Sequence, residues 1–201
     1  MNRRLGVLIS GRGSNLQSLI DAIASGRLNA TIAVVISNKA DAFGLERARA
    51  AGIEAIVISH RGWSSRDDYD RALVRELQSR DVGLVCLAGF MRIVGGPMID
   101  AYPEAILNIH PALLPSFPGA DAQRQALEHG VKVSGVTVHF VNRDLDAGPI
   151  VLQRAVPVLD DDATATLAAR ILEQEHLVYP EAVGIVLDGA WKIDGRRFVR
   201  L

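Results

Sequence analysis

The sequence predicts an α/β fold with a mostly parallel central sheet and helices on both faces. Short, continuous apolar runs alternate along the chain with amphipathic stretches, and glycine, serine and asparagine separate the two. Continuous apolar strands with helices between them are typical of a parallel sheet that is covered on both sides. A length of 201 residues with 49% hydrophobic content favours one globular domain, with two lobes around a common cleft.

In the first half, four apolar runs predict strands and three amphipathic stretches predict helices. The expected strands are residues 5–9, 30–36, 53–58 and 83–88, and the expected helices are residues 15–25, 43–51 and 66–80. In the third helix, Tyr69, Leu73 and Leu77 repeat every four residues and form one apolar stripe. Ser65 is its expected N-cap.

The second half changes character after a fifth expected strand at residues 106–110. Residues 136–141 alternate in polarity and residues 149–158 follow a turn-like stretch, which predicts a hairpin. A long amphipathic helix is expected from about residue 164 to 187, with Pro180 as a kink. The tail predicts a short strand pair around Asp194 and Gly195.

The composition excludes several classes of protein. With 22 Lys and Arg against 23 Asp and Glu, the net charge of −1 argues against binding to a nucleic-acid backbone. One cysteine, Cys86, excludes an intramolecular disulfide and a metal site built from cysteines, and we expect no metal. The apolar stretches are too short for a membrane span, and the N-terminus lacks signal-peptide architecture. We therefore expect a cytoplasmic protein without a membrane partner.

A glycine-rich turn joins the first expected strand to the first expected helix. The segment Ser10-Gly-Arg-Gly-Ser-Asn15 would expose backbone N–H groups at a helix N-terminus, which suits a phosphate. A dinucleotide fingerprint is excluded, because Leu16 replaces the third glycine and the second strand ends in Ser37-Asn38 rather than an acid. An ordinary capped turn remains the alternative.

Asn108 and His110 end the fifth expected strand and should project together, since side chains two apart point the same way. Such a pair can stabilise an oxyanion, although a structural histidine is the alternative. Asp144 and Asp146 follow in a predicted loop, and either could orient His110; spacing does not choose between them. His139 alternates with apolar neighbours and is expected to be structural.

Several segments together resemble the phosphoribosylglycinamide formyltransferase family over nearly the whole chain. They are ISGRGSNLQSLI, SNKADAFGLERA, LAGFMRIV, NIHPALLPSFPG, GVTVHFVNRDLDAGPIVLQ and EQEHLVYP. The resemblance implies a Rossmann-like formyltransferase fold as a single domain over residues 1–201. Within it, a phosphate- and nucleotide-binding half (about 1–100) would precede a catalytic and folate half (about 101–201). It also implies formyl transfer from 10-formyltetrahydrofolate to the amine of glycinamide ribonucleotide in de novo purine biosynthesis.

The resemblance also implies the site residues. The catalytic positions are Asn108, His110 and Asp146. The ribonucleotide positions are Gly13, Ser14, Asn15, Leu172, Glu173, Gln174 and Glu175. The formyl-folate positions are Arg66, Met91, Arg92, Ile93, Val94, Asn108, Asn142, Arg143, Asp144, Leu145 and Asp146. The chain departs from the family after its Pro-Gly, where Asp121 and Gln123 lie in a stretch that carries histidines in many members.

These residues fit direct attack of the amine on the formyl carbon, without a protein nucleophile. Asn108 and a protonated His110 would stabilise the tetrahedral oxyanion, and Asp146 would favour the cation of His110. The expected partners are the two small-molecule substrates, and the chain would be a monomer or homodimer. One alternative is a 10-formyltetrahydrofolate hydrolase, although a first strand near residue 5 leaves no room for the usual extra N-terminal domain. A second alternative is a non-catalytic folate- or phosphate-binding module.

Overall fold

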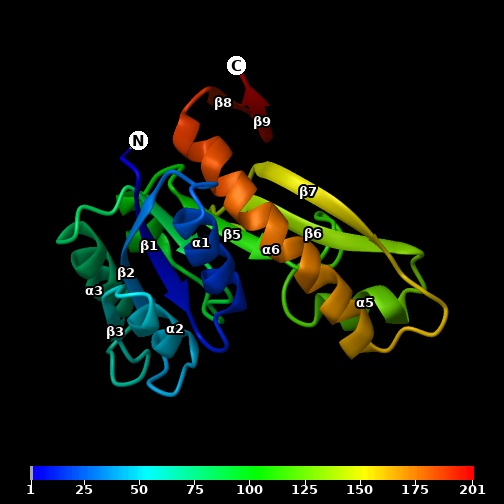
Figure 1. Ribbon diagram of the computed structural model, residues 1–201, viewed down its shortest axis with the longest axis horizontal. Coiled ribbons are helices and arrows are strands. Elements are labelled where there is room, and N and C mark those ends of the chain that lie inside the picture. The colour runs from blue at the N-terminus through cyan, green and yellow to red at the C-terminus, as the bar shows by residue number, and fades with distance from the viewer. Residues whose placement is uncertain (1) are drawn as a thin grey trace. The chain divides into compact units, whose positions relative to one another are not determined.

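The computed structural model describes residues 2–201 and confirms the predicted α/β class (Figure 1). The chain folds as two compact units, the first ending at Leu107 and the second spanning Asn108–Leu201. The strand β5 (Ile106–His110) contains the boundary between them.

The first unit alternates strands and helices and contains parallel strands in the order β3-β2-β1-β4. Its elements are β1 (Arg4–Ile9), α1 (Ser14–Ala24), β2 (Thr31–Ser37), α2 (Gly44–Ala50), β3 (Ala55–Val57), α3 (Arg66–Gln78), β4 (Leu84–Leu87) and α4 (Gly96–Ala101). All four side chains of β4 are buried, as expected for a strand covered on both faces.

Close contacts of two glycines show that helices cover both faces of this sheet. A Cβ on Gly6 would lie 2.4 Å from a Leu77 methyl of α3, and a Cβ on Gly44 in α2 would lie 2.5 Å from a methyl of Ile9. Gly6 and Ile9 are three apart in β1 and therefore point to opposite faces. Helices α3 and α2 thus pack on opposite sides of β1.

The second unit is built from two hairpins and one long helix. Its elements after β5 are α5 (Ala122–Glu128), β6 (Val133–Phe140), β7 (Ile150–Pro157), α6 (Thr164–Asp188), β8 (Trp191–Asp194) and β9 (Arg197–Arg200). The pairs β6–β7 and β8–β9 are antiparallel, which confirms both predicted hairpins. Helix α6 packs along β6 and β7 (Figure 1).

The element boundaries show where sequence patterns carried too little information. Helices α4 and α5 were not expected, because only Met98 of α4 and Ala122 and Ala126 of α5 are buried, so neither sequence displays a clear apolar stripe. Helix α6 continues as one element through Pro180. Ser65 caps α3 as predicted, since its side chain accepts a hydrogen bond from the Asp68 N–H.

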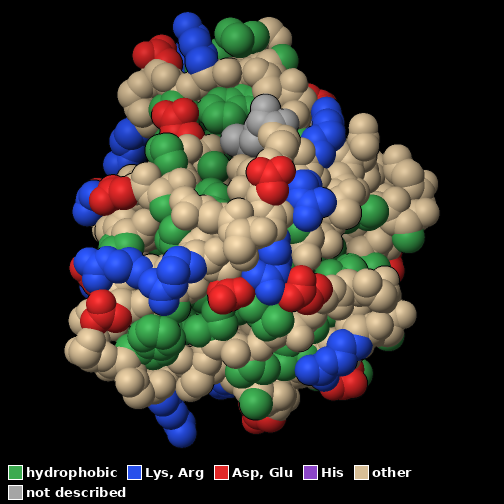
Figure 2. Space-filling view, turned by 90° about the vertical axis from the view of Figure 1, so that its left-hand side faces the viewer, with side chains coloured by type: hydrophobic (Ala, Val, Ile, Leu, Met, Phe, Trp, Pro, Cys, Tyr) green, Lys and Arg blue, Asp and Glu red, His purple; other side chains and the backbone are tan. Residues whose placement is uncertain are grey.

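Charged side chains of opposite sign lie next to one another on the face that Figure 2 shows. Within the first unit, Arg80 bridges Glu54 at 2.6 Å and Glu76 at 2.7 Å. Among residues 2–201, no helix combines the length and the apolar character needed to cross a membrane.

Candidate active site

Strand β5 ends in the second unit with two polar side chains on one face, Asn108 and His110. The His110 side chain is only 5% exposed, although it ends the strand. Its Nε2 lies 2.8 Å from the carbonyl oxygen of Phe117, to which it donates a hydrogen bond. In the neutral ring the second nitrogen, Nδ1, therefore carries a lone pair.

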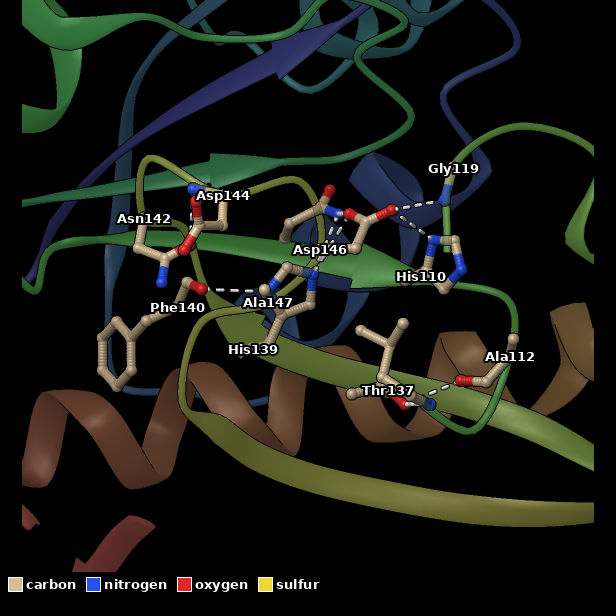
Figure 3. Close-up of polar contacts among 12 residues, drawn as sticks. His110, Ala112, Gly119, Thr137, His139, Phe140, Asn142, Asp144, Asp146 and Ala147 are labelled. Atoms are coloured by element: carbon tan, nitrogen blue, oxygen red, sulfur yellow. Dashed lines mark hydrogen bonds and ion pairs between the residues drawn. The ribbon is translucent and has the colours of Figure 1, made fainter. Parts of the chain in front are cut away.

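Asp146 lies beside both residues, on the loop between β6 and β7 (Figure 3). One carboxylate oxygen lies 3.4 Å from His110 Nδ1 and accepts the Gly119 N–H at 2.8 Å. The other lies 3.5 Å from the Asn108 amide nitrogen. Asp146 adopts the left-handed region at φ 49°, which is unfavourable for a non-glycine residue and is typical of functional sites.

Gly148 fixes the course of this loop. A Cβ there would lie 1.9 Å from the Phe140 carbonyl oxygen, so the close approach of the two backbone segments requires glycine. Arg196, in the turn between β8 and β9, also donates a hydrogen bond to the Ala147 carbonyl at 3.1 Å.

His139 is the residue that the sequence reasoning missed. It is 2% exposed, and its Nδ1 donates to the Phe140 carbonyl at 2.9 Å (Figure 3). Its Nε2 lies 3.2 Å from the Asn108 amide nitrogen. The same Nε2 lies 3.6 Å from Asp146. Its alternation with valines in β6 predicted only a side opposite to theirs; that this side faces β5 and the Asp146 loop was not visible in the pattern.

The electrostatics correct one expectation. Burial lowers the pKa of His110 below its ordinary value, and this outweighs the opposing effects of the Phe117 carbonyl and Asp146. The lowered pKa favours the neutral ring near pH 7, whereas a protonated His110 was expected. Asp146 is desolvated, which alone would raise its pKa, but the neighbouring His139 side chain and the Gly119 N–H that donates to it bring the pKa below its usual value.

The remaining loop positions differ in exposure from Asp146. Arg143, Asp144 and Leu145 are exposed, and the Asp144 N–H donates to the side-chain oxygen of Asn142 at 3.1 Å. Asp144 thus belongs to a local turn, while Asp146 lies next to His110. At the departure from the family pattern, Asp121 forms an exposed ion pair with Arg124 at 3.2 Å.

Four of the expected ribonucleotide positions lie on α6 in the second unit. Glu175 is buried and Glu173 is exposed, while Leu172 and Gln174 are partly exposed.

The expected phosphate loop lies in the first unit, between β1 and α1. Gly13 precedes the helix at φ 69°, and a Cβ there would lie 2.6 Å from the Gly44 Cα. Ser14 and Asn15 begin α1, whose first-turn N–H groups have no partner within the helix. The loop therefore presents backbone donors at the positive end of a helix dipole, which suits an anion.

The first unit contains five of the expected formyl-folate positions, Arg66, Met91, Arg92, Ile93 and Val94. Met91 and Ile93 are exposed at 74% and 59%, whereas Val94 is buried. Nearby, a cavity of about 170 Å³ is lined by His60, Trp63, Ser65, Arg66, Tyr69, Arg92 and Ile93. This volume is too small for a whole drug-sized ligand, for which pockets of about 300–1,000 Å³ are usual, but it suits one end of one.

Comparison with known proteins identifies the family of this chain. Residues 3–183 match the family described as Formyl transferase. The chain belongs to this formyl transferase family. Phosphoribosylglycinamide formyltransferase of Escherichia coli (strain K12) is 46% identical over 199 residues, covering 95% of this chain and 93% of that protein.

Two further relatives show which members of the family this formyl transferase resembles. The crystal structure of glycinamide ribonucleotide transformylase 1 from Symbiobacterium toebii matches with a TM-score of 0.98 and 56% identity, covering 100% of this chain and 94% of that one. The human trifunctional purine biosynthetic protein adenosine-3 is 50% identical over 186 residues, or 92% of this chain. The chain spans only 18% of that human protein and 14% of its Drosophila melanogaster counterpart.

Proposed function

We propose that this formyl transferase moves the formyl group of 10-formyltetrahydrofolate to the amine of glycinamide ribonucleotide, a step of de novo purine biosynthesis. The observation that carries the proposal is the cluster formed by the buried His110 and the partly buried Asn108 and Asp146. Relatives that align over nearly their full length are named for this reaction. The partners would be small molecules in the cytoplasm.

The cluster offers the two capacities that attack of an amine on a formyl carbon requires. Negative charge develops on the formyl oxygen, and N–H donors aimed at it lower the barrier. The Asn108 amide nitrogen lies 3.2 Å from His139 Nε2 and 3.5 Å from Asp146, and its N–H on the longer contact would turn to the formyl oxygen. The His110 Nε2–H already donates to a backbone carbonyl at 2.8 Å, and a formyl oxygen in that place is an equivalent acceptor.

The proton of the attacking amine needs an acceptor as well. In neutral His110, Nδ1 is the atom that can take a second proton, and Asp146 lies 3.4 Å from it. The resulting imidazolium would be stabilised by the Asp146 carboxylate beside Nδ1, while its Nε2–H donates to the formyl oxygen in place of the Phe117 carbonyl. Neutral His110 thus acts as a base, and the imidazolium then returns the proton to the folate nitrogen as the bond between that nitrogen and the formyl carbon breaks.

The first unit fits the ends of the two substrates. Gly13, Ser14 and Asn15 would hold the ribonucleotide phosphate with backbone N–H groups. The cationic Arg66 and Arg92 would meet the carboxylates of the folate tail beside the aromatic rings of Trp63 and Tyr69. Within residues 2–201, the buried Tyr69 hydroxyl has no hydrogen-bond partner, which leaves one donor for a ligand in this region. The formyl-folate supplies the one-carbon group when bound.

The test is the rate of tetrahydrofolate formation from 10-formyltetrahydrofolate with and without glycinamide ribonucleotide. The proposal predicts turnover only when the ribonucleotide is present. Equal turnover without it would indicate a hydrolase, and binding without turnover would indicate a non-catalytic module; either result contradicts the proposal.

A further inference from the structure

The loop that follows β4, residues 89–95, carries the exposed side chains of Met91 and Ile93, yet its backbone is held at both ends. The Ser10 N–H donates to the Gly89 carbonyl at 3.1 Å, and the Met91 N–H donates to the Ser10 hydroxyl at 2.8 Å. At the other end, the Gly95 N–H donates to Asp70 at 2.5 Å.

Ser10 is itself oriented by a buried polar chain. Its hydroxyl donates to the Asn38 side-chain oxygen at 2.6 Å, and the Asn38 amide nitrogen lies 3.1 Å from His60 Nδ1. Because Ser10 gives its only hydrogen to Asn38, its lone pairs remain for the Met91 N–H. Ser10 and Asn38 are 4% and 3% exposed, so the hydrogen bond between their side chains forms away from water, where it is stronger.

Asp70, on α3, is the second anchor and is 1% exposed. Burial raises the pKa of its carboxyl above the ordinary value, partly offset by the Gly95 N–H and Arg66. Burying a carboxylate lowers the stability of the folded protein, which indicates that Asp70 has a role other than stabilising the fold. A Cβ on Gly95 would lie 2.8 Å from its oxygen, which shows how closely the loop end approaches.

We propose that Ser10, Asn38 and Asp70 are positioning residues that hold the 89–95 loop in the shape that binds formyl-folate. The inference rests on the proposed function, since it assumes that this loop contacts the folate. The three residues act through the backbone of the loop and do not touch the reacting atoms. Their loss should therefore weaken folate binding and leave the ribonucleotide site unchanged.

The experiment compares Ser10→Ala and Asp70→Leu with the conservative variants Ser10→Thr and Asp70→Asn, which keep an oxygen acceptor. Ser134→Ala is the control, because it removes a buried hydroxyl from the second unit. We expect Ser10→Ala and Asp70→Leu each to raise the KM for 10-formyltetrahydrofolate and the Kd for tetrahydrofolate about tenfold, as loss of one buried hydrogen bond commonly does. The conservative variants should recover most of this, and the KM for the ribonucleotide should stay within about twofold.

Amide hydrogen exchange of Met91 and Gly95 should accelerate in the same two variants, whether or not the protein is catalytic. If amide exchange accelerates but folate affinity is unchanged, the inference is wrong. It is also wrong if the KM for 10-formyltetrahydrofolate and the KM for the ribonucleotide rise equally. If wild-type protein does not bind tetrahydrofolate at all, the proposed function itself fails.

Discussion

His110 Nδ1 lies 3.4 Å from the carboxylate of Asp146, and the opposite nitrogen of the same ring donates to the Phe117 carbonyl. Both ring nitrogens therefore face oxygen acceptors, an arrangement that only the imidazolium satisfies fully. Burial nevertheless lowers the pKa of His110, which favours the neutral form of the ring near pH 7. Proton uptake at Nδ1 during the reaction would resolve this conflict.

Replacing Asp146 with Asn removes the charge next to His110 and keeps the size of the side chain. The pKa of His110 should fall further, because the carboxylate is one of the groups that raise it. Turnover near pH 7 should fall at least about 100-fold, the lower range for acid–base assistance, while substrate affinities change much less. An NMR titration of His110 alongside steady-state kinetics measures both effects.

Asp144→Asn is the matched control for this substitution. Asp144 is exposed and its backbone N–H takes part in a local turn with Asn142, so kinetics and titration should both stay close to wild type. If Asp144→Asn moves the pKa of His110 and Asp146→Asn does not, the assignment of the acid is wrong.

His110 should also make stability depend on pH. Its folded-state pKa is lowered, so the unfolded chain binds more protons in the range between the folded and unfolded values. The free energy of unfolding should therefore decrease as pH falls through and below about 6.5. Measured by urea unfolding, the free energy of unfolding of His110→Gln should decrease less than that of wild type between about pH 7.5 and about pH 5.5. An identical pH dependence in the variant would argue against a buried, neutral ring.

His139 should support the positions of Asn108 and Asp146. His139→Phe removes Nε2 from its place 3.2 Å from the Asn108 amide and 3.6 Å from Asp146. Loss of a buried polar partner costs about 1–3 kcal/mol, which predicts a fall in kcat of about tenfold or more. His139→Gln, which can still accept a hydrogen bond, should recover part of the loss. Equal kcat values in wild type and His139→Phe would contradict this role.

Gly13→Ala tests the phosphate loop. The left-handed conformation of Gly13 disfavours alanine by about 1–2 kcal/mol. The new Cβ would also meet the Gly44 Cα at 2.6 Å, so backbone must shift. The KM for the ribonucleotide should rise about tenfold or more, while the KM for the formyl donor stays nearly constant. Gly26→Ala is the control, because it has a similar φ of 73° but open space around its Cβ.

Local patterns predicted much of the fold. Runs such as residues 5–9 and 84–87 are apolar throughout, and burial on both faces explains that composition. Helices α4 and α5 escaped prediction because they bury only Met98 and only Ala122 and Ala126, respectively, which leaves no apolar period to detect.

The candidate site was only partly predictable for a related reason. Asn108 and His110 share a strand, so their common direction follows from the alternation of side chains. The choice between Asp144 and Asp146 depends on a loop conformation with a positive φ, and the place of His139 depends on how strands associate. Neither is encoded in a local pattern. The balance between burial and Asp146 in setting the pKa of His110 likewise needed the folded arrangement.

The most direct test of the account follows the destination of a ¹³C-labelled formyl group. Wild-type protein is incubated with labelled 10-formyltetrahydrofolate and glycinamide ribonucleotide, and the products are separated and quantified by mass spectrometry. Direct attack of the amine predicts that the label enters the ribonucleotide, in an amount equal to the tetrahydrofolate formed. Label recovered mainly as formate, with the ribonucleotide unmodified, would contradict it.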